Sequence, residues 1–322
     1  MINMSMNLII NFIKLLNKKQ KYNFYFILFL TLAASIIETI GIASILPLLA
    51  IIISGKDFFL QIELLENFPI IIEILNSSTE KEIVNYFLIT IILIFFFKNI
   101  FLIFFNYIKE NFFFNLRKSF SKKIYNNFLK EDIKNILKFN SGYFINVILN
   151  IVSDSINNVI VPFVFLLNEI LLIIFIFFLI FIIEPTTSLV VAILFFIFLL
   201  SIYLFFSKKI KILGRQKIEY DTKQIKNLNE VFSMLKYLKI LNKNKFFQND
   251  FNFNNKKVND VSKTQTLYEI YPKYMLEFFS VIILSTVIII LTYSKVSTKE
   301  VLPIIGLYAF AAIRLMPSVN KI

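Results

Sequence analysis

The stretch Val159–Ser207 reads VIVPFVFLLNEILLIIFIFFLIFIIEPTTSLVVAILFFIFLLSIYLFFS. Two apolar segments lie on either side of the turn EPTTS, and each is long enough for an α-helix to cross the hydrocarbon core, which needs about 20 residues. A single charged residue, Glu169, lies inside the two segments. The stretch therefore predicts two membrane-spanning helices, 159–183 and 188–207, joined by a short turn.

The composition of the whole chain agrees with a membrane protein. Hydrophobic residues make up 57% of the 322 residues, which is more than a soluble domain carries. The chain contains no cysteine and no histidine, which excludes disulfides and removes the commonest metal ligand and general base. We therefore expect no metal site and no catalytic residue. The net charge of +13 does not require a nucleic-acid partner, because cytoplasmic loops of membrane proteins are rich in lysine.

Four further apolar segments extend the pattern in both directions. Together with the first pair they predict six spans, at about 22–54, 83–108, 159–183, 188–207, 274–293 and 301–322. Residues 1–21 lack the small-residue cleavage site of a signal peptide, and their apolar and basic residues favour a short amphipathic helix on the cytoplasmic membrane surface.

The distribution of lysine and arginine predicts the orientation of the chain. The connections 109–158 and 208–273 are rich in basic residues, whereas the loop 55–82 is mainly acidic. Basic loops remain on the cytoplasmic side of a membrane. We therefore expect a multi-pass protein of the cytoplasmic (inner) membrane with both termini in the cytoplasm.

The two long inner connections show helical periodicity. In NLRKSFSKKIYNNFLKEDIKNIL, residues 115–137, apolar residues recur at steps of mostly three and four. The spans should therefore continue as helices into the cytoplasm and be joined by short helices at their tips. The expected fold is an all-α membrane protein with long cytoplasmic helical extensions. The outer loop 56–76 is apolar enough to form a short helix on the outer membrane face, with an irregular loop as the alternative.

Six spans, cytoplasmic termini and two long helical hairpins resemble the transmembrane domain of ABC exporters. The segment IIETIGIASILPLLAIII, residues 36–53, resembles the first span of the bacterial lipid-linked oligosaccharide flippases in that family. LYAFAAIRLMPSVNKI, residues 307–322, resembles their sixth span, and NEVFSMLKYLKILNKNKFF, residues 229–247, resembles their second cytoplasmic tip. The resemblance implies a homodimer that takes a lipid-linked substrate from the inner leaflet.

The resemblance also implies a nucleotide-binding domain, and no motif of such a domain is present in the sequence. A phosphate-binding P-loop needs the spacing G-x-x-x-x-G-K-[ST], which none of the five glycines provides. We therefore expect this domain after residue 322 in the same polypeptide or in a separate chain. ATP and magnesium would bind there, and no cofactor is expected on the chain itself.

Several charged residues lie inside the predicted spans, where each costs several kcal/mol and is a functional candidate. They are Glu38, Lys98, Glu169, Glu277 and Arg314, and Lys273 lies near the inner boundary of the fifth span. At 1.5 Å per residue, Arg314, Lys98 and Lys273 lie about 20, 22 and 30 Å below the outer ends of their helices. Three cations therefore fall in the inner half of the membrane, and Glu38 lies near its middle.

In the family that the chain resembles, basic residues line the cavity and hold the pyrophosphate of the lipid. The resemblance therefore implies a substrate cavity that contains Lys98, Lys273 and Arg314, with Glu38 as a fourth residue. Two of the three cations are lysines where arginines are expected, so charge is kept and bidentate geometry is lost. The alternative is that these cations form structural ion pairs with the glutamates or extend to the membrane interface.

The predicted cytoplasmic tips are expected to transmit force from the ATPase domain. Apolar residues there would contact that domain, and the candidates are Ile133, Ile136, Val231 and Phe232. The alternative is that they pack between the long helices. For the whole protein, we expect the membrane half of an ABC exporter of a lipid-linked or other amphipathic anionic substrate. The alternatives are an exporter of peptides or drugs and a truncated membrane protein or scaffold that transports nothing.

Overall fold

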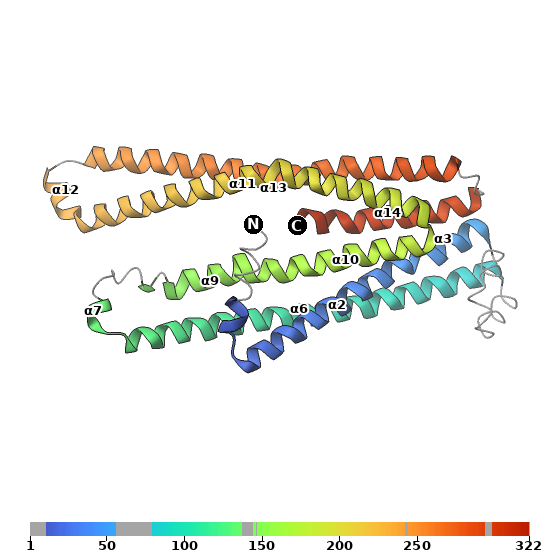
Figure 1. The fold of residues 1–322 in the computed structure, drawn as a ribbon, viewed down its shortest axis with the longest axis horizontal. Helices are drawn as coiled ribbons and strands as arrows, with labels where there is room; N and C mark the ends of the chain where they lie inside the picture. The colour runs from blue at the N-terminus through green and yellow to red at the C-terminus, as the bar shows by residue number, and fades with distance from the viewer. Residues whose placement is uncertain are drawn as a thin grey trace. The chain divides into compact units, whose positions relative to one another are not determined.

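The computed structural model describes residues 11–55, 79–136, 144–145, 147–241, 244–293 and 298–321. The expected helix at 56–76 lies outside these ranges. The described chain is almost entirely helical and contains no strand, which confirms the all-α prediction (Figure 1). In chain order the helices are α2 (Lys18–Ala43), α3 (Ile45–Ser54), α6 (Glu80–Lys130), α7 (Ile133–Ile136), η2 (Val147–Ile151), α9 (Val152–Ser155), η3 (Ile156–Ile160), α10 (Val161–Ile183), α11 (Pro185–Ser233), α12 (Leu235–Leu241), α13 (Asn244–Tyr293) and α14 (Thr298–Lys321).

The protein is a multi-pass membrane protein. Five helical stretches in the described part of the chain are long and apolar enough to cross a bilayer: Lys18–Ile53, Lys81–Lys130, Val147–Ile183, Pro185–Ser233 and Asn244–Tyr293. The sixth predicted span falls on α14, whose apolar part, Val301–Met316, is shorter. The six-span count therefore stays a prediction.

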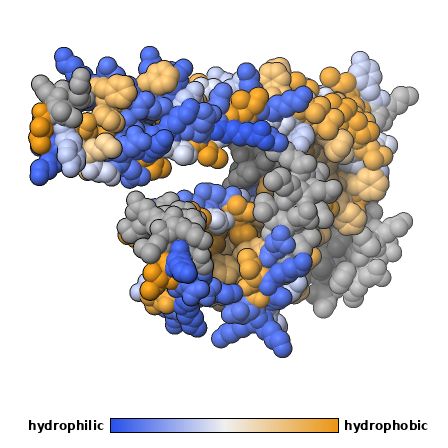
Figure 2. Space-filling model, turned by 60° about the vertical axis from the view of Figure 1, so that its left-hand side comes forward, coloured by the Kyte–Doolittle hydropathy of each residue, from blue (hydrophilic) through white to orange (hydrophobic). Residues whose placement is uncertain are grey.

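Much of the exposed surface is apolar, as a lipid-facing surface requires. Large hydrophobic side chains such as Phe97, Ile103 and Phe178 are exposed on their helices. Figure 2 shows broad hydrophobic areas of this kind on the surface. In water such areas would be unfavourable, whereas hydrocarbon tails solvate them well.

Three helices are much longer than a membrane crossing. Helix α6 has 51 residues, α11 has 49 and α13 has 50. At 1.5 Å per residue each is about 75 Å long, whereas the hydrocarbon core is about 30 Å thick. These helices therefore extend well beyond the membrane, as the periodicity of the inner connections predicts.

The chain divides into two compact units. The first contains Met1–Pro185 and Ile288–Ile322, and the second contains Thr186–Val287. In the first unit, α2 packs against α6 and α10, while α14 packs against α3 and α10. This unit contains three of the four residues predicted for the substrate cavity.

The helix starts in the first unit follow from capping residues. Helix α2 begins at Lys18, inside the segment predicted as a separate N-terminal helix, because Asn17 and Gln20 form a capping box. Thr79 and Glu82 form the same motif at the start of α6.

The predicted first span is interrupted and consists of α2 and α3. The interruption lies at Ser44. Pro47 has no N–H to donate to the carbonyl of Ala43, so the regular hydrogen-bond ladder cannot continue through this point. The break divides the span at a position two turns beyond Glu38.

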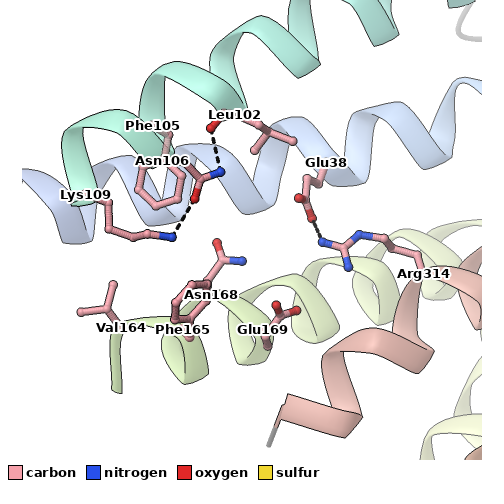
Figure 3. Close-up of a pocket in the computed structure, with 10 residues that line it drawn as sticks. All are labelled: Glu38, Leu102, Phe105, Asn106, Lys109, Val164, Phe165, Asn168, Glu169 and Arg314. Atoms are coloured by element: carbon pink, nitrogen blue, oxygen red, sulfur yellow. Dashed lines mark hydrogen bonds and ion pairs between the residues drawn. The ribbon is translucent and has the colours of Figure 1, made fainter. Parts of the chain in front are cut away.

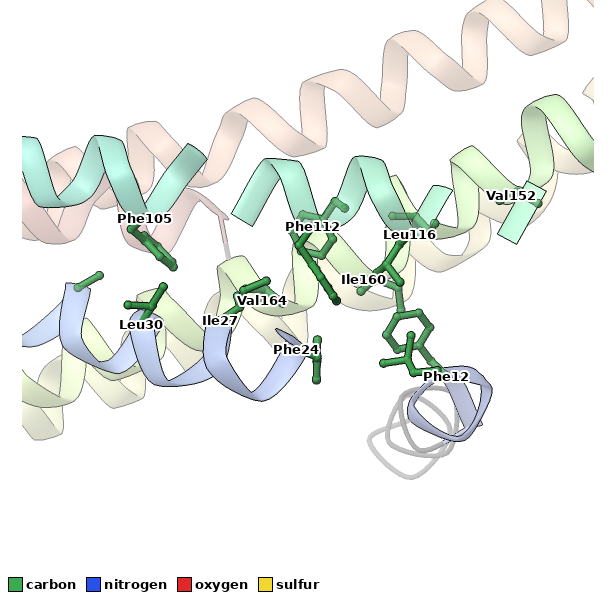
Figure 4. Packing of buried hydrophobic residues seen from close by; sticks show 14 residues of the cluster. Phe12, Phe24, Ile27, Leu30, Phe105, Phe112, Leu116, Val152, Ile160 and Val164 are labelled. Carbon is green, nitrogen blue, oxygen red and sulfur yellow. The ribbon is translucent and has the colours of Figure 1, made fainter. Parts of the chain in front are cut away.

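A hydrophobic cluster holds the first unit together beside the candidate site (Figure 4). Phe24 and Ile27 of α2 pack with Phe112 of α6 and Val164 of α10. Phe12, from the helical residues 11–15, joins the same cluster and meets the ring of Phe24 edge to face at 6.1 Å. Residues 11–16 therefore pack against the protein through their apolar side chains.

The second unit contains most of α11 and α13, with α12 between them. The rings of Phe198 and Phe279 stack at 3.9 Å and join the apolar parts of the two long helices. Near the tip, Asn227 Nδ2 donates to Asp250 Oδ2 at 2.6 Å. Contacts of both kinds hold α11 and α13 together along their length.

Candidate functional site

A polar pocket lies between α2, α6, α10 and α14 inside the first unit. It encloses ≈ 130 Å³. Figure 3 shows its lining side chains projecting from these helices toward one another. The lining residues are Glu38, Leu102, Phe105, Asn106, Lys109, Val164, Phe165, Asn168, Glu169 and Arg314. Because these helices are otherwise apolar, so many polar side chains in one place mark the pocket as the best candidate site.

An ion pair between α14 and α2 closes one side of the pocket. Nη2 of Arg314 donates to Oε2 of Glu38. The side chain of Arg314 is 29% exposed and that of Glu38 is 13% exposed. The pair is therefore shielded but still accessible from the pocket. It also explains how an arginine is accommodated in the apolar sequence of α14.

Lys98 is the third predicted cavity residue in the first unit. Its side chain lies against the backbone of α2 at Gly41, with Nζ 3.3 Å from the position that a Cβ of this glycine would occupy. Nζ also lies 4.1 Å from the centroid of the Phe95 ring. Of the predicted cavity residues, Glu38 and Arg314 therefore line the pocket, whereas Lys98 lies against α2 at Gly41 and is not among the lining residues.

Lys273 belongs to the second unit. It is exposed on α13, and its Nζ lies 6.0 Å from the centroid of the Tyr274 ring. A cavity role for Lys273 stays a prediction.

Sequence reasoning missed Lys109, which is only 3% exposed. Its Nζ donates to Oδ1 of Asn106 at 2.7 Å and lies 4.0 Å from the centroid of the Phe165 ring. The predicted second span ends at residue 108, which leaves Lys109 in the inner connection. Lys109 follows Lys98 by 11 residues, which is close to three helical turns and places both on one side of α6. That spacing is the signal that could have found it.

Helix α10 contributes two further polar residues, Asn168 and Glu169. Glu169 is buried, and Figure 3 shows both side chains projecting into the pocket. Oδ1 of Asn168 is buried and accepts no hydrogen bond from the described residues. A ligand or water molecule that donates a hydrogen bond would satisfy this oxygen.

The lining of the pocket balances its charges. Two bases, Lys109 and Arg314, face two acids, Glu38 and Glu169. The sequence predicts Glu38 in the cavity beside the cations, with structural ion pairs to the glutamates as the alternative. The structure places Glu38 and Glu169 in the same wall as Lys109 and Arg314, so the charges of this wall are compensated.

The four predicted coupling residues lie at or near the tips of the long helices. Ile133 on α7 and Phe232 on α11 are exposed, and the side chain of Ile136 lies outside the described part of the structure. Val231 is half-buried and lines a hollow of ≈ 250 Å³ with Leu235 and other tip residues. A contact of these residues with another domain stays a prediction.

Comparison of the sequence with protein-family models and with curated proteins found no match.

Proposed function

We propose that the chain is the membrane-spanning half of an ATP-driven ABC exporter that moves a lipid-linked or other amphipathic anion from the inner leaflet. The observation that carries this proposal is the pocket that brings Arg314 and Lys109 together inside otherwise apolar helices, with Lys98 nearby against α2 at Gly41. Cations at such positions are expensive and are usually retained for function. The resemblance of residues 36–53 and 307–322 to exporter spans adds support.

The pocket is lined by both cationic and apolar side chains, as binding of an amphipathic anion requires. Arg314 and Lys109 can donate charge-assisted hydrogen bonds to phosphate oxygens. Leu102, Phe105 and Val164 provide apolar surface for the first part of a lipid tail. The head group would be held by charge, while the rest of the tail stays in hydrocarbon.

The proposal assigns ATP and magnesium to a separate ATPase domain. The sequence supports this assignment because none of its glycines has the P-loop spacing. The nucleotide would bind to a partner domain that contacts the tips around Ile133 and Phe232. Two copies of the chain would form the complete transporter, and closure of the ATPase pair would switch it between inward- and outward-facing states.

A second candidate function is export of an amphipathic peptide or drug. The observation that favours it is the pair of carboxylates, Glu38 and Glu169, in the pocket wall. A substrate with both positive and negative groups would find partners for each. In this case a labelled cationic peptide would be transported, and Glu169→Gln would reduce its transport.

The deciding experiment is ATP-dependent translocation in proteoliposomes that contain the chain and the ATPase domain encoded with it. The probe is a fluorescent sugar on a short-chain prenyl pyrophosphate. Arg314→Ala and Lys98→Ala should each lower the rate about tenfold or more, because each removes a cation from the group. Lys223→Ala, which removes an exposed lysine of α11, is the matched control and should leave the rate unchanged. Unchanged rates in both Arg314→Ala and Lys98→Ala would reject the proposal.

A further inference from the structure

Arg314 is already paired with Glu38, so a substrate anion must compete with this carboxylate for the guanidinium. Glu38 accepts from Nη2 of Arg314, and both side chains are part of the pocket wall. A carboxylate and a phosphate present the same kind of oxygen acceptors to a guanidinium. Glu38 therefore occupies an interaction that the phosphate of a substrate would need.

A second cation lies within reach of Glu38. Lys98 contacts α2 at Gly41, which follows Glu38 by three residues and so lies on the same side of the helix. The absence of a side chain at Gly41 leaves room for the lysine, whose Cδ is 3.1 Å from the position of the missing Cβ. The ammonium group of Lys98 therefore lies beside the turn of α2 that carries Glu38.

From this arrangement we infer that Glu38 is an exchangeable internal anion, paired with Arg314 in the empty site and transferred to Lys98 when a phosphate group binds Arg314. The inference rests on the proposed function, since it concerns the same site. In the empty site, the Glu38 carboxylate occupies the position on Arg314 that the substrate phosphate would take. Lys98 is a positioning residue, because it acts on the site by binding Glu38.

The exchange keeps every charge compensated. A shielded carboxylate without a partner is strongly unfavourable, so Glu38 cannot release Arg314 unless another cation accepts it. Lys98 is that cation. Lys109 lines the same pocket, where Asn106 accepts a hydrogen bond from its Nζ and the ring of Phe165 lies 4.0 Å away, and it adds a second positive charge to the wall.

The exchange predicts that one substitution in the pocket wall strengthens phosphate binding instead of weakening it. Glu38→Gln keeps the shape of the side chain and removes its charge, so it should remove the carboxylate that competes for Arg314 and tighten phosphate binding about tenfold. If the pair were only structural, the same change would loosen the site and weaken binding. Glu38→Asp shortens the side chain by one methylene, weakens the pair and should tighten binding about two- to threefold.

A double-mutant cycle tests the role of Lys98. Lys98→Ala should weaken binding about fivefold in the wild-type background, because no cation then accepts the Glu38 carboxylate when it leaves Arg314. In the Glu38→Gln background the same change should have little effect, since no carboxylate remains to be accepted. Equal weakening in both backgrounds would show that Lys98 contacts the head group directly, and would overturn the exchange.

The measurement is binding by the purified full chain in detergent micelles, followed by native mass spectrometry and calorimetry. The probes are a short-chain prenyl pyrophosphate, inorganic pyrophosphate and the prenyl alcohol. Glu219→Gln, which removes the carboxylate of the exposed Glu219–Lys223 pair of α11, is the matched control and should not change binding.

The outcomes separate the inference from the proposed function. Tighter binding of the prenyl pyrophosphate by Glu38→Gln supports the exchange, and equal tightening for inorganic pyrophosphate identifies free phosphate as a sufficient ligand. If binding occurs but is unchanged or weaker in Glu38→Gln and Glu38→Asp, the exchange is wrong while an anionic substrate still stands. If neither pyrophosphate binds to any variant, the anionic substrate itself is rejected, and the exchange with it.

Discussion

At the scale of single residues, Arg314 on α14 is paired with Glu38 on α2, which lies 276 positions earlier in the sequence. Neither charge would be stable alone in apolar surroundings. We expect Arg314→Met to lower the free energy of unfolding by about 2 kcal/mol, less than for a fully buried pair because both side chains are partly exposed. Unfolding in a detergent titration measures this.

The same titration has an internal control. Lys223→Met breaks an ion pair with Glu219 on the exposed surface of α11, where solvent screens the charges. Its unfolding midpoint should equal that of the wild type. If Arg314→Met also kept the wild-type midpoint, the Arg314–Glu38 pair would contribute nothing to folding.

Gly306 brings two helices of the first unit into close contact. A methyl group at this position of α14 would overlap Cδ1 of Leu49 on α3. We expect Gly306→Ala to force Leu49 into another rotamer and to destabilise the protein by about 1 kcal/mol. Leu49→Ala in the same chain should remove the penalty of Gly306→Ala, although Leu49→Ala has a cost of its own. Additive effects of the two changes in thermal unfolding would contradict this close packing.

At the scale of elements, two π-helical segments precede α10. They are η2 and η3, with the single turn α9 between them. A π-turn contains one more residue than an α-turn. The turn absorbs this residue, so the side chains before and after it keep the directions that they would have in a continuous α-helix. The sequence shows no signal for these segments, because their residues are ordinary helix residues.

This geometry predicts which single-residue deletions the chain tolerates. Deleting Asn158, in η3, should convert a π-turn to an α-turn and leave a folded protein. Deleting Ile174, in regular α10, should rotate one part of the helix by roughly 100° relative to the other and misplace Glu169 or Ile176. Size-exclusion chromatography in detergent and the thermal midpoint distinguish the two. Aggregation of both variants, or normal folding of both, would contradict the prediction.

The tip of the second unit depends on amides around one carboxylate. Asp250 accepts from Asn227 at 2.6 Å and from Asn254 at 3.2 Å. We expect Asn227→Ala to cost about 1–2 kcal/mol, since Asp250 loses one of these two charge-assisted hydrogen bonds. Faster limited proteolysis near α12 would report the loosened tip, and Asn259→Ala, on the exposed side of α13, is the matched control.

At the scale of the whole molecule, the elements were predictable and the site only in part. Apolar length predicted the five helical stretches that are long enough to cross a bilayer, and the sixth span stays a prediction. Periodicity predicted the long extensions of α6, α11 and α13. The break between α2 and α3 was not predicted, although Pro47 marks it. Lys98, Glu38 and Arg314 were found because charge inside an apolar segment is visible in a sequence.

The rest could not be predicted because it depends on which helices are neighbours. Lys109 was assigned to a loop, and its burial depends on Phe165 of a different helix. The pairing of Glu38 with Arg314 likewise depends on α14 lying close to α2. A hydropathy pattern identifies which residues cross the membrane, but it contains no information on which charges will meet.

The orientation of the whole chain can be tested directly, because the protein has no cysteine of its own. Single cysteines at Ile133 and Phe232, both exposed near the tips, should react with a membrane-impermeant maleimide only in inside-out vesicles. A cysteine at Lys81, exposed at the start of α6, should react only in intact cells. This follows because lysine-rich connections stay in the cytoplasm and the acidic loop does not. Labelling of Phe232→Cys in intact cells would show that the topology is the reverse of the predicted one. The predicted ATPase contacts would then lie on the outer side of the membrane.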